Sequence, residues 1–417
     1  MIDHFEQHRF GNATMHDLFA SWESAGAGDL SGFTDNWLRT AGPDTIALDR
    51  AAGVIRRTPP PDHPADRPHR IRAAVADNGG WTDRVLEIDS PETPFDAGDR
   101  PVLLDPYNDT WALLMPDKLT MDALEQLLPQ VEDPELRAGV WSNVRSALHN
   151  AAVDPVDVFQ LALVSLPVED TEDSRRRTMA WLYGWVLPLQ PDPHTALAQL
   201  HTAARAKLDG AAPASEEQLA AYRATIATSS DIALLGGWLD GAGLPEGIPL
   251  DVDLRWRILT RLATLGEVDL DELDRRLAAE PSAAAQVQHA RAHASLPNAE
   301  AKAWAWSCFT GEVNLPNYEL EAVGLGFWRG GQEELTDPYV ERYFADLPDT
   351  VNVRSGWVLA DAAEHFFPRT SVTRETLARS QALVADGDLD LSVRRRLVDE
   401  ADTLERKLAV LEAYPRP

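Results

Sequence analysis

Apolar positions in the first 42 residues recur with the period of amphipathic helices. One helix follows Thr14, a capping residue with Asp17 three positions later, and its apolar face holds Met15, Leu18, Phe19 and Trp22. A second helix ends at Gly42-Pro43, and its apolar face holds Leu30, Phe33, Trp37 and Leu38. The pattern predicts a helical hairpin over residues 1–42. Two helices cannot bury this many large side chains against each other, so we expect a partner surface.

Residues 43–116 change to the alternation typical of β-strands. We expect strands around residues 71–75, 85–88, 101–104 and 110–114, with a tight turn at Asn78-Gly79-Gly80 between the first two. The proline-rich run 59–64 cannot pair in a sheet and is expected to be an exposed loop. This spacing predicts a small antiparallel β-sandwich.

Residues 117–417 show helical periodicity throughout. One apolar stripe contains Leu254, Ile258, Leu262 and Leu265, Asp269 can cap the next helix, and the last helix, over 393–411, is the longest. Many short helices separated by prolines predict an α-solenoid of the HEAT or armadillo kind. The predicted fold is therefore mainly α, with domains at 1–42 (hairpin), 43–116 (β-sandwich) and 117–417 (solenoid).

The charge balance excludes several classes of partner. The formal net charge is -29, which repels phosphates and anionic lipid headgroups, so we expect neither nucleic acid nor membrane partners. The one cysteine, Cys308, lies in an apolar run, which favours a buried side chain and a reducing compartment. The N-terminus has no basic leader followed by an apolar run, so we expect no signal peptide and a cytoplasmic protein.

Three stretches carry a resemblance to a known family. They are His8-Arg9-Phe10-Gly11-Asn12-Ala13-Thr14, then Leu254-Arg255-Trp256-Arg257-Ile258-Leu259, and then 317–344 with Asn317-Tyr318-Glu319-Leu320, Gly326-Phe327-Trp328 and Pro338-Tyr339-Val340-Glu341-Arg342-Tyr343-Phe344. Together they resemble the carboxy-terminal half of actinobacterial aminopeptidase N, a gluzincin zinc aminopeptidase. The resemblance implies that the hairpin is the tail of a catalytic domain and that the solenoid covers the catalytic cleft.

The family's catalytic elements are missing from this chain. The G-A-M-E-N segment that clamps the peptide amino group and the H-E-x-x-H segment that binds zinc do not occur in the sequence. His4 and His8, and His289 and His293, are spaced i,i+4, but neither pair has a third ligand nearby, which favours ordinary solvated histidines. We therefore predict no metal and no catalytic residue on this chain, and zinc on a partner.

Three functions remain open. The first is a non-catalytic subunit of a split, heteromeric zinc aminopeptidase, whose partners are a zinc-bearing catalytic chain and a peptide substrate, in general peptide turnover or in leader-peptide trimming. By itself such a chain is no enzyme. The alternatives are a truncated fragment of a single-chain aminopeptidase N and a stand-alone peptide-binding α-solenoid.

Two sets of residues are predicted to serve this function. Side chains expected on the interface with the zinc-bearing chain are Phe5, Phe10, Leu18, Phe19, Trp22, Phe33 and Trp37. Side chains expected to bind substrate, from the stretch that most resembles the family, are Tyr318, Phe327, Trp328, Gln332 and Arg354. As large aromatics, Phe327 and Trp328 are more typical of a core, and Arg354 can bind a substrate carboxylate or form a surface ion pair.

Overall fold

The computed structural model describes residues 1–77, 80–386 and 388–416. The protein is mainly helical, with small β-sheets preceding a large helical region, as predicted. It divides into two compact units, Met1–Ala147 and Leu148–Pro417. Both predicted domain boundaries, after residues 42 and 116, fall within the first unit, and the three-domain division stays a prediction.

The N-terminal helices form the hairpin expected from their apolar periodicity. They are α1 (Ile2–Gln7), α2 (Met15–Trp22) with the π-helical turn η1 (Glu23–Ala27), and α3 (Ser31–Phe33) with the π-helical turn η2 (Thr34–Leu38). Thr14 and Asp17 form the predicted capping box: the Thr14 side chain accepts from the Asp17 amide and the Asp17 carboxylate from the Thr14 amide. Gly42 ends the segment with a φ of +77°, which suits glycine.

Two small sheets follow, built from seven strands. These are β1 (Asp44–Asp49), β2 (Val54–Thr58), β3 (His69–Asp77), β4 (Gly80–Ile88), β5 (Glu92–Pro94), β6 (Val102–Leu104) and β7 (Ala112–Met115). One sheet has the order β5-β2-β1-β7 and the other β4-β3-β6. Ile46 and Ile55 of the first sheet share one core with Ile71 and Val102 of the second, which makes the pair a sandwich.

The sandwich departs from the prediction in two respects. All strand pairs are antiparallel except β1 and β7, which run parallel, so the first sheet is mixed. β1, β2 and β5 lie outside the four strands expected from alternation. The predicted turn at 78–80 falls partly on residues 78 and 79, outside the described residues.

The first unit ends with helices packed on the sandwich. They are α4 (Lys118–Leu127), the 3₁₀ turn η3 (Leu128–Gln130) and most of α5 (Pro134–His149). On α5, Asn143 Nδ2 donates to the Leu104 carbonyl at 2.8 Å. A Cβ on Gly139 would meet the Pro106 carbonyl oxygen at 1.7 Å, so this close approach requires glycine.

The second unit contains only helices among its described residues. Their bounds are α6 (Pro155–Ser165), α7 (Glu172–Trp181), η4 (Leu182–Val186), η5 (Leu187–Leu189), α8 (Pro193–Gly210), α9 (Glu216–Thr228), α10 (Ile232–Leu239), α11 (Val252–Leu265), α12 (Leu270–Ala279), α13 (Ala283–Ala294), α14 (Ala299–Thr310), α15 (Asn317–Phe327), α16 (Glu333–Asp346), η6 (Leu347–Asn352), α17 (Gly356–His365), α18 (Arg374–Ala385) and α19 (Leu391–Ala413).

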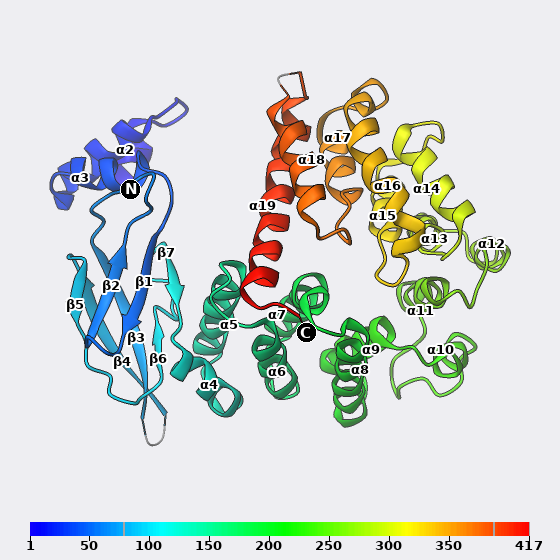
Figure 1. The fold of residues 1–417 in the computed structure, drawn as a ribbon, viewed down its shortest axis with the longest axis horizontal. Helices are drawn as coiled ribbons and strands as arrows, with labels where there is room; N and C mark the ends of the chain where they lie inside the picture. The colour runs from blue at the N-terminus through cyan, green and yellow to red at the C-terminus, as the bar shows by residue number, and fades with distance from the viewer. Residues whose placement is uncertain (78–79, 387, 417) are drawn as a thin grey trace. The chain divides into compact units, whose positions relative to one another are not determined.

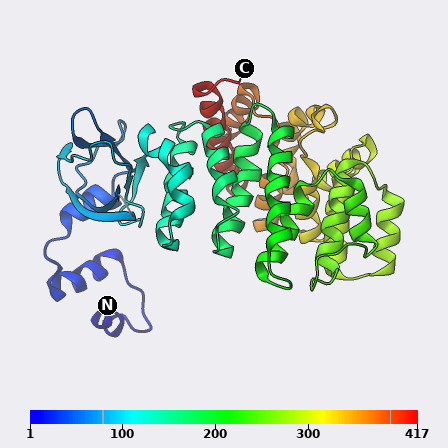
Figure 2. The same ribbon diagram turned by 90° about the horizontal axis from the view of Figure 1, so that it is seen from below.

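These helices form two layers, as a solenoid requires. From α7 to α19, each odd-numbered helix packs against the next odd-numbered one, while α6 packs on α8 and α14 and α18 pack on α16. Figure 1 shows the odd-numbered helices following one another around an arc. In Figure 2 the green and yellow-green helices stand side by side with similar axes. Asp269 caps α12 and α19 is the longest helix, both as predicted.

The last helix returns to the start of the second unit. Arg406 Nη1 donates to Asn150 Oδ1 at 3.0 Å, and Lys407 Nζ donates to the Gly184 carbonyl at 3.1 Å. Beyond α19, Arg416 donates to the Pro188 carbonyl. These bonds join the two ends of the helical row, so α19 closes the arc.

One large apolar core of this unit lies around α14, α15 and α17. It contains Trp306, Phe309, Phe327 and Phe366, all at most 1% exposed. Cys308 belongs to the same core, and burial raises the pKa of its thiol to about 12. The thiol is therefore a buried apolar group, as predicted for Cys308.

Candidate functional site

A cavity of about 730 Å³ lies within the second unit. It is lined by α6, α7, α8, α9, α11, α13 and α15 and by the turn η4. Much of the wall consists of small side chains, including Ala203, Ala204, Ala220, Ala224 and Ala227, which leave the space open. The volume lies in the range typical of sites for small molecules and short chain segments.

The cavity wall is basic, although the chain as a whole is acidic. Glu172 is the one acidic side chain among the described lining residues, against eight basic ones: Arg175, Arg176, Lys207, Arg223, Arg257, Arg261, Arg291 and Arg329. This local excess of cations contrasts with the net charge of -29 of the whole chain.

Five of the eight cations have a carboxylate partner. Arg223 and Arg257 both contact Asp253, each at 2.9 Å. The remaining pairs are Arg175 and Lys207 with Glu217 and Arg176 with Asp173. Three carboxylates thus serve these five cations, so their charge is partly neutralised within the protein.

Arg261, Arg291 and Arg329, hereafter the inner arginines, form no ion pair with any described residue. Arg261 Nε donates to the Ser229 carbonyl at 2.6 Å. Arg329 donates from Nε and Nη2 to Ser295 Oγ, at 3.2 and 3.1 Å. The Arg291 Nε is buried without a hydrogen-bond partner. Three half-buried guanidinium groups thus share one cavity without a described carboxylate at ion-pair distance.

The inner arginines influence one another electrostatically. Burial lowers the pKa of all three, and it lowers the pKa of Arg329 to about 10, with the charge of Arg291 as the next cause. All three remain protonated near neutral pH. Tyr183 also lines the cavity, from the π-helical turn η4, and its phenol partly offsets the lowering. Such π-turns often accompany functional sites.

Helix α11 shows how the local sequence builds this wall. Leu254, Ile258 and Leu262 of the predicted apolar stripe are buried in the core. Arg257 and Arg261, spaced i,i+4 on another face, reach the cavity. Sequence reasoning missed them because a basic stripe opposite an apolar one is typical of a solvent-facing surface.

The hairpin presents a second candidate surface. Phe5, Phe10, Phe33 and Leu38 are exposed by 63%, 99%, 44% and 50%, and we call these four residues the hairpin surface. Leu38 was not among the predicted interface residues. Of the remaining predicted ones, Phe19 is buried, and Leu18, Trp22 and Trp37 are half-buried. Four exposed large apolar side chains within the first 38 residues make this segment a candidate binding surface.

An aromatic row runs along the hairpin and onto the sandwich. Trp22 stacks on Phe19 at 5.6 Å between ring centroids, Phe33 lies 6.2 Å from Phe19, and Trp37 lies 6.5 Å from Phe33. Trp37 then packs edge-on against His69 at 5.1 Å. Trp37 therefore belongs partly to the sandwich, whereas Trp22 lies at the other end of the row.

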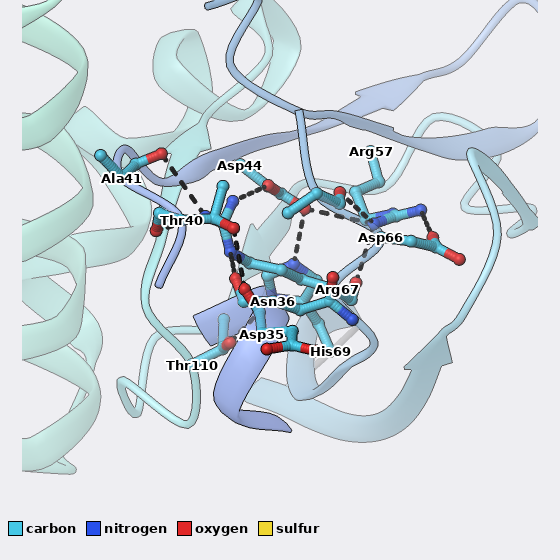
Figure 3. A network of polar contacts seen from close by, with 11 residues as sticks. Asp35, Asn36, Thr40, Ala41, Asp44, Arg57, Asp66, Arg67, His69 and Thr110 are labelled. Carbon is cyan, nitrogen blue, oxygen red and sulfur yellow. Dashed lines mark hydrogen bonds and ion pairs between the residues drawn. The ribbon is translucent and has the colours of Figure 1, made fainter. Parts of the chain in front are cut away.

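A buried ionic network fixes the hairpin to the sandwich (Figure 3). Asp44 is fully buried and contacts Arg67 Nη1 at 2.6 Å and Arg57 Nη1 at 3.3 Å. Arg67 also donates to the Asn36 carbonyl at 2.8 Å and to the Thr40 carbonyl at 3.0 Å, both in the hairpin segment. One arginine therefore joins the end of the hairpin to the first strand.

His69 completes this network in its neutral form. Burial lowers its pKa, so Nε2 donates to Asp44 Oδ2 at 3.1 Å while Nδ1 accepts from the Thr110 hydroxyl at 2.8 Å. The positive charges that balance the Asp44 carboxylate are therefore those of Arg57 and Arg67, because His69 is neutral. The hairpin surface is thus held in place by a network beneath it.

Comparison with known proteins identifies the chain. A family model of the ERAP1-like C-terminal domain matches residues 113–406. The chain belongs to this family. It is also 29% identical to aminopeptidase N of Streptomyces lividans over an alignment of 437 positions, which covers 97% of this chain and 51% of that protein. The chain therefore spans about half the length of this curated relative, and the resemblance to the carboxy-terminal half of an aminopeptidase N is confirmed.

In this ERAP1-like domain, none of the five predicted substrate-binding residues lines the cavity. Phe327 and Trp328 lie in the core, which favours the alternative interpretation of these aromatics, and Trp328 Nε1 donates to the Phe366 carbonyl at 2.8 Å. Gln332 is buried and donates to the Thr264 and Ser295 carbonyls. Their role in substrate binding stays a prediction.

The other two predicted substrate-binding residues lie elsewhere in the domain. Tyr318 is 67% exposed, beside Trp357 at 6.4 Å between ring centroids. Arg354 donates to the Phe309 and Cys308 carbonyls near the end of α14. This is neither a free guanidinium nor the surface ion pair considered from the sequence, but a cation at a helix C-terminus.

The histidines that are spaced i,i+4 in the sequence have other partners in the structure. Across the described ranges, no three His, Cys, Asp or Glu side chains gather closely enough to hold a metal. His4 Nδ1 instead bonds to Ser21, His289 Nε2 contacts Asp274 at 2.7 Å, and His293 stacks on Trp304 at 3.8 Å. In the same ranges no helix combines the length and the apolar character needed to span a bilayer.

Proposed function

We propose that this chain is the non-catalytic subunit of a split zinc aminopeptidase, acting with a separate zinc-bearing chain. It covers the catalytic cleft of that chain in the cytoplasm and positions a peptide for removal of its N-terminal residue, in general peptide turnover or leader-peptide trimming. The single observation that supports this most is the match to about half of an aminopeptidase N, with the zinc-binding motifs absent from the matched half.

The hairpin surface supports docking on a zinc-bearing chain. Its exposed aromatic side chains have the composition of interface anchors, and the buried network of Asp44 and Arg67 keeps the hairpin in one position before binding. A pre-positioned surface loses little conformational entropy on association, which favours a tight complex.

The cavity of the helical unit supports the handling of peptide. Its alanine-rich wall can accommodate a chain of varied side chains, and contacts remote from the zinc can position the reacting end of a peptide. Chemistry on the scissile bond belongs to the zinc-bearing chain in this proposal, so this chain contributes binding and orientation.

An activity titration tests the proposal. A fixed amount of a zinc-bearing chain is mixed with rising amounts of this chain, and hydrolysis of an aminoacyl chromogenic substrate is followed. We expect activity to rise and saturate, and Phe33→Ala to raise the half-maximal concentration by about tenfold or more, because an aromatic anchor is lost. Val85→Ala, which removes a 57% exposed apolar side chain from strand β4, is the control.

The same titration separates the remaining functions. The proposal is contradicted if the peptidase activity of the zinc-bearing chain stays the same at every concentration of this chain. Activity that appears only when both halves are joined in one polypeptide indicates a fragment of a single-chain enzyme. Peptide binding by this chain without any effect on hydrolysis indicates a stand-alone binding solenoid.

A further inference from the structure

We propose that Tyr318 and Trp357 form a docking site for a basic segment of a partner protein, in which a lysine or arginine side chain lies against the two rings. Neither residue is among those that line the cavity, and both belong to the second unit, whereas the hairpin surface belongs to the first. The site therefore goes beyond the proposed function and does not depend on it.

The two rings are brought together by the packing of α15 against α17. Tyr318 is the second residue of α15, and Trp357 is the second residue of α17. Their ring centroids lie 6.4 Å apart, and the ring planes are inclined by 45°. Both side chains are exposed, although large aromatic side chains usually fill cores, as Trp306 and Phe327 do in the same unit. The pair therefore offers ring surface that is open to a partner.

Two exposed valines accompany the rings. Val351 belongs to the 3₁₀ turn η6, and Val353 follows it, four residues before Trp357. Val353 packs beside the end of α14, because a Cβ on Gly311 would lie 2.9 Å from the valine side chain. The segment that leads into α17 is thus held against the domain before a partner binds, which limits the entropy lost on association.

The charges near the rings favour a basic partner. Glu312, Glu319 and Asp349 lie in or beside the segments that carry the rings and valines, and they form no ion pair or side-chain hydrogen bond with any described residue. Arg354, in the segment before α17, donates to two backbone carbonyls of α14 instead. Glu319 lies in the first turn of α15, where it also offsets the partial positive charge of the helix start. Carboxylates beside exposed ring faces attract a cation.

The overall charge disfavours other occupants. A second copy of this chain also carries a net charge of -29, and nucleic acid and anionic lipid are repelled by the same field. A lysine or arginine side chain fits the site because its cationic end can lie over a ring face, where the attraction grows as water is excluded. The apolar stem of such a side chain can pack on the valines.

Fluorescence anisotropy with the full chain tests the site at about 0.15 M salt, which screens attraction by distant surface charges. The probe is a short fluorescein-labelled serine–glycine peptide that contains two arginines and two leucines. The matched peptide has citrulline at both arginine positions, which preserves the shape of the side chain and removes its charge. We expect the arginine peptide to bind at least about tenfold more tightly than the citrulline peptide.

Variants locate the preference on the two rings. Trp357→Ala and Tyr318→Ala are each expected to weaken binding of the arginine peptide by about tenfold, whereas Tyr318→Phe stays within about twofold because it keeps the ring face. Trp111→Ala, which removes an exposed tryptophan of the first unit, is the matched control and is expected to stay within about twofold. Because Tyr318 and Trp357 are exposed, their variants are expected to leave the melting temperature unchanged.

Three results overturn the inference. One is equal affinity for the arginine and citrulline peptides. Another is a loss of less than about twofold in both Trp357→Ala and Tyr318→Ala, which indicates nonspecific attraction to an acidic surface. The third is binding of choline without binding of the arginine peptide, which indicates a small-molecule site. Since no zinc-bearing chain takes part in this measurement, its failure and the failure of the activity titration are independent.

Discussion

Replacing Arg67 by methionine tests whether the buried network holds the hairpin in place. Arg67 is fully buried and donates to Asp44 Oδ1 at 2.6 Å, to the Asn36 carbonyl at 2.8 Å and to the Thr40 carbonyl at 3.0 Å. Methionine preserves much of the apolar stem but provides no donor. We expect both a less stable first unit and a hairpin that is released from the sandwich.

The magnitude follows from what each partner loses. Removing one side of a buried ion pair costs about 3–5 kcal/mol. Asp44 keeps Arg57 at 3.3 Å and His69 at 3.1 Å, which places the charge contribution at the low end of that range. Two hairpin carbonyls lose their donor, at about 1 kcal/mol each. The expected loss in the free energy of unfolding is therefore about 5 kcal/mol.

Urea denaturation followed by tryptophan fluorescence measures this loss, and limited proteolysis of the first 42 residues measures release of the hairpin. Arg39→Met is the control, because Arg39 pairs with Asp35 on the surface at 61% exposure and its loss is expected to cost less than about 0.5 kcal/mol. A loss below about 1 kcal/mol for Arg67→Met, or an unchanged cleavage rate, would refute the role assigned to the network.

Three further predictions concern single side chains. Trp22→Ala is expected to weaken association with a zinc-bearing chain by about 2 kcal/mol without changing the melting temperature. Trp37→Ala is expected to weaken association and also to lower the melting temperature, because Trp37 packs on His69. The activity titration measures the association, and melting curves measure the stability. Burial lowers the pKa of Lys302 from 10.5 to about 7, so its folded form binds fewer protons and stability rises between about pH 7 and 10.5; Lys302→Met is expected to remove that rise in denaturation curves. Arg354 donates to carbonyls near the end of α14, so Arg354→Met is expected to lower the melting temperature. Peptide affinity is expected to stay within about twofold of that of the unchanged chain. A large loss of affinity at unchanged stability would contradict this.

Local chemistry predicted much of this fold. The capping pair Thr14 and Asp17, the cap at Asp269 and the stripe from Leu254 to Leu265 each depend on neighbours within a few residues, and the structure confirms all three. The parallel pair of β1 and β7 was not predicted, because their contact joins residues about seventy positions apart and no turn signal marks it.

The candidate sites depended more on tertiary placement. Arg261, Arg291 and Arg329 come from separate parts of the sequence, and only the stacking of α11, α13 and α15 brings them to one cavity. The stretch around Phe327 and Trp328 was favoured from the sequence because it is rich in aromatics, but these side chains fill the core.

Trp37 shows what helical periodicity cannot predict. Its helical spacing predicts an apolar face correctly, yet the sequence does not reveal that His69, thirty-two positions later, covers part of that face. Periodicity identifies which side chains need a partner and leaves open which partner they find.

The most direct test of the central claim is sedimentation velocity of this chain mixed with a zinc-bearing aminopeptidase chain, at low salt and at about 0.5 M salt. Because the hairpin surface is apolar, a heteromer is predicted to form with one copy of each chain and to persist at the higher salt, with peptidase activity sedimenting with the complex. Two independently sedimenting species at about 10 µM of each chain, with activity only at the position of the zinc-bearing chain, would contradict the account.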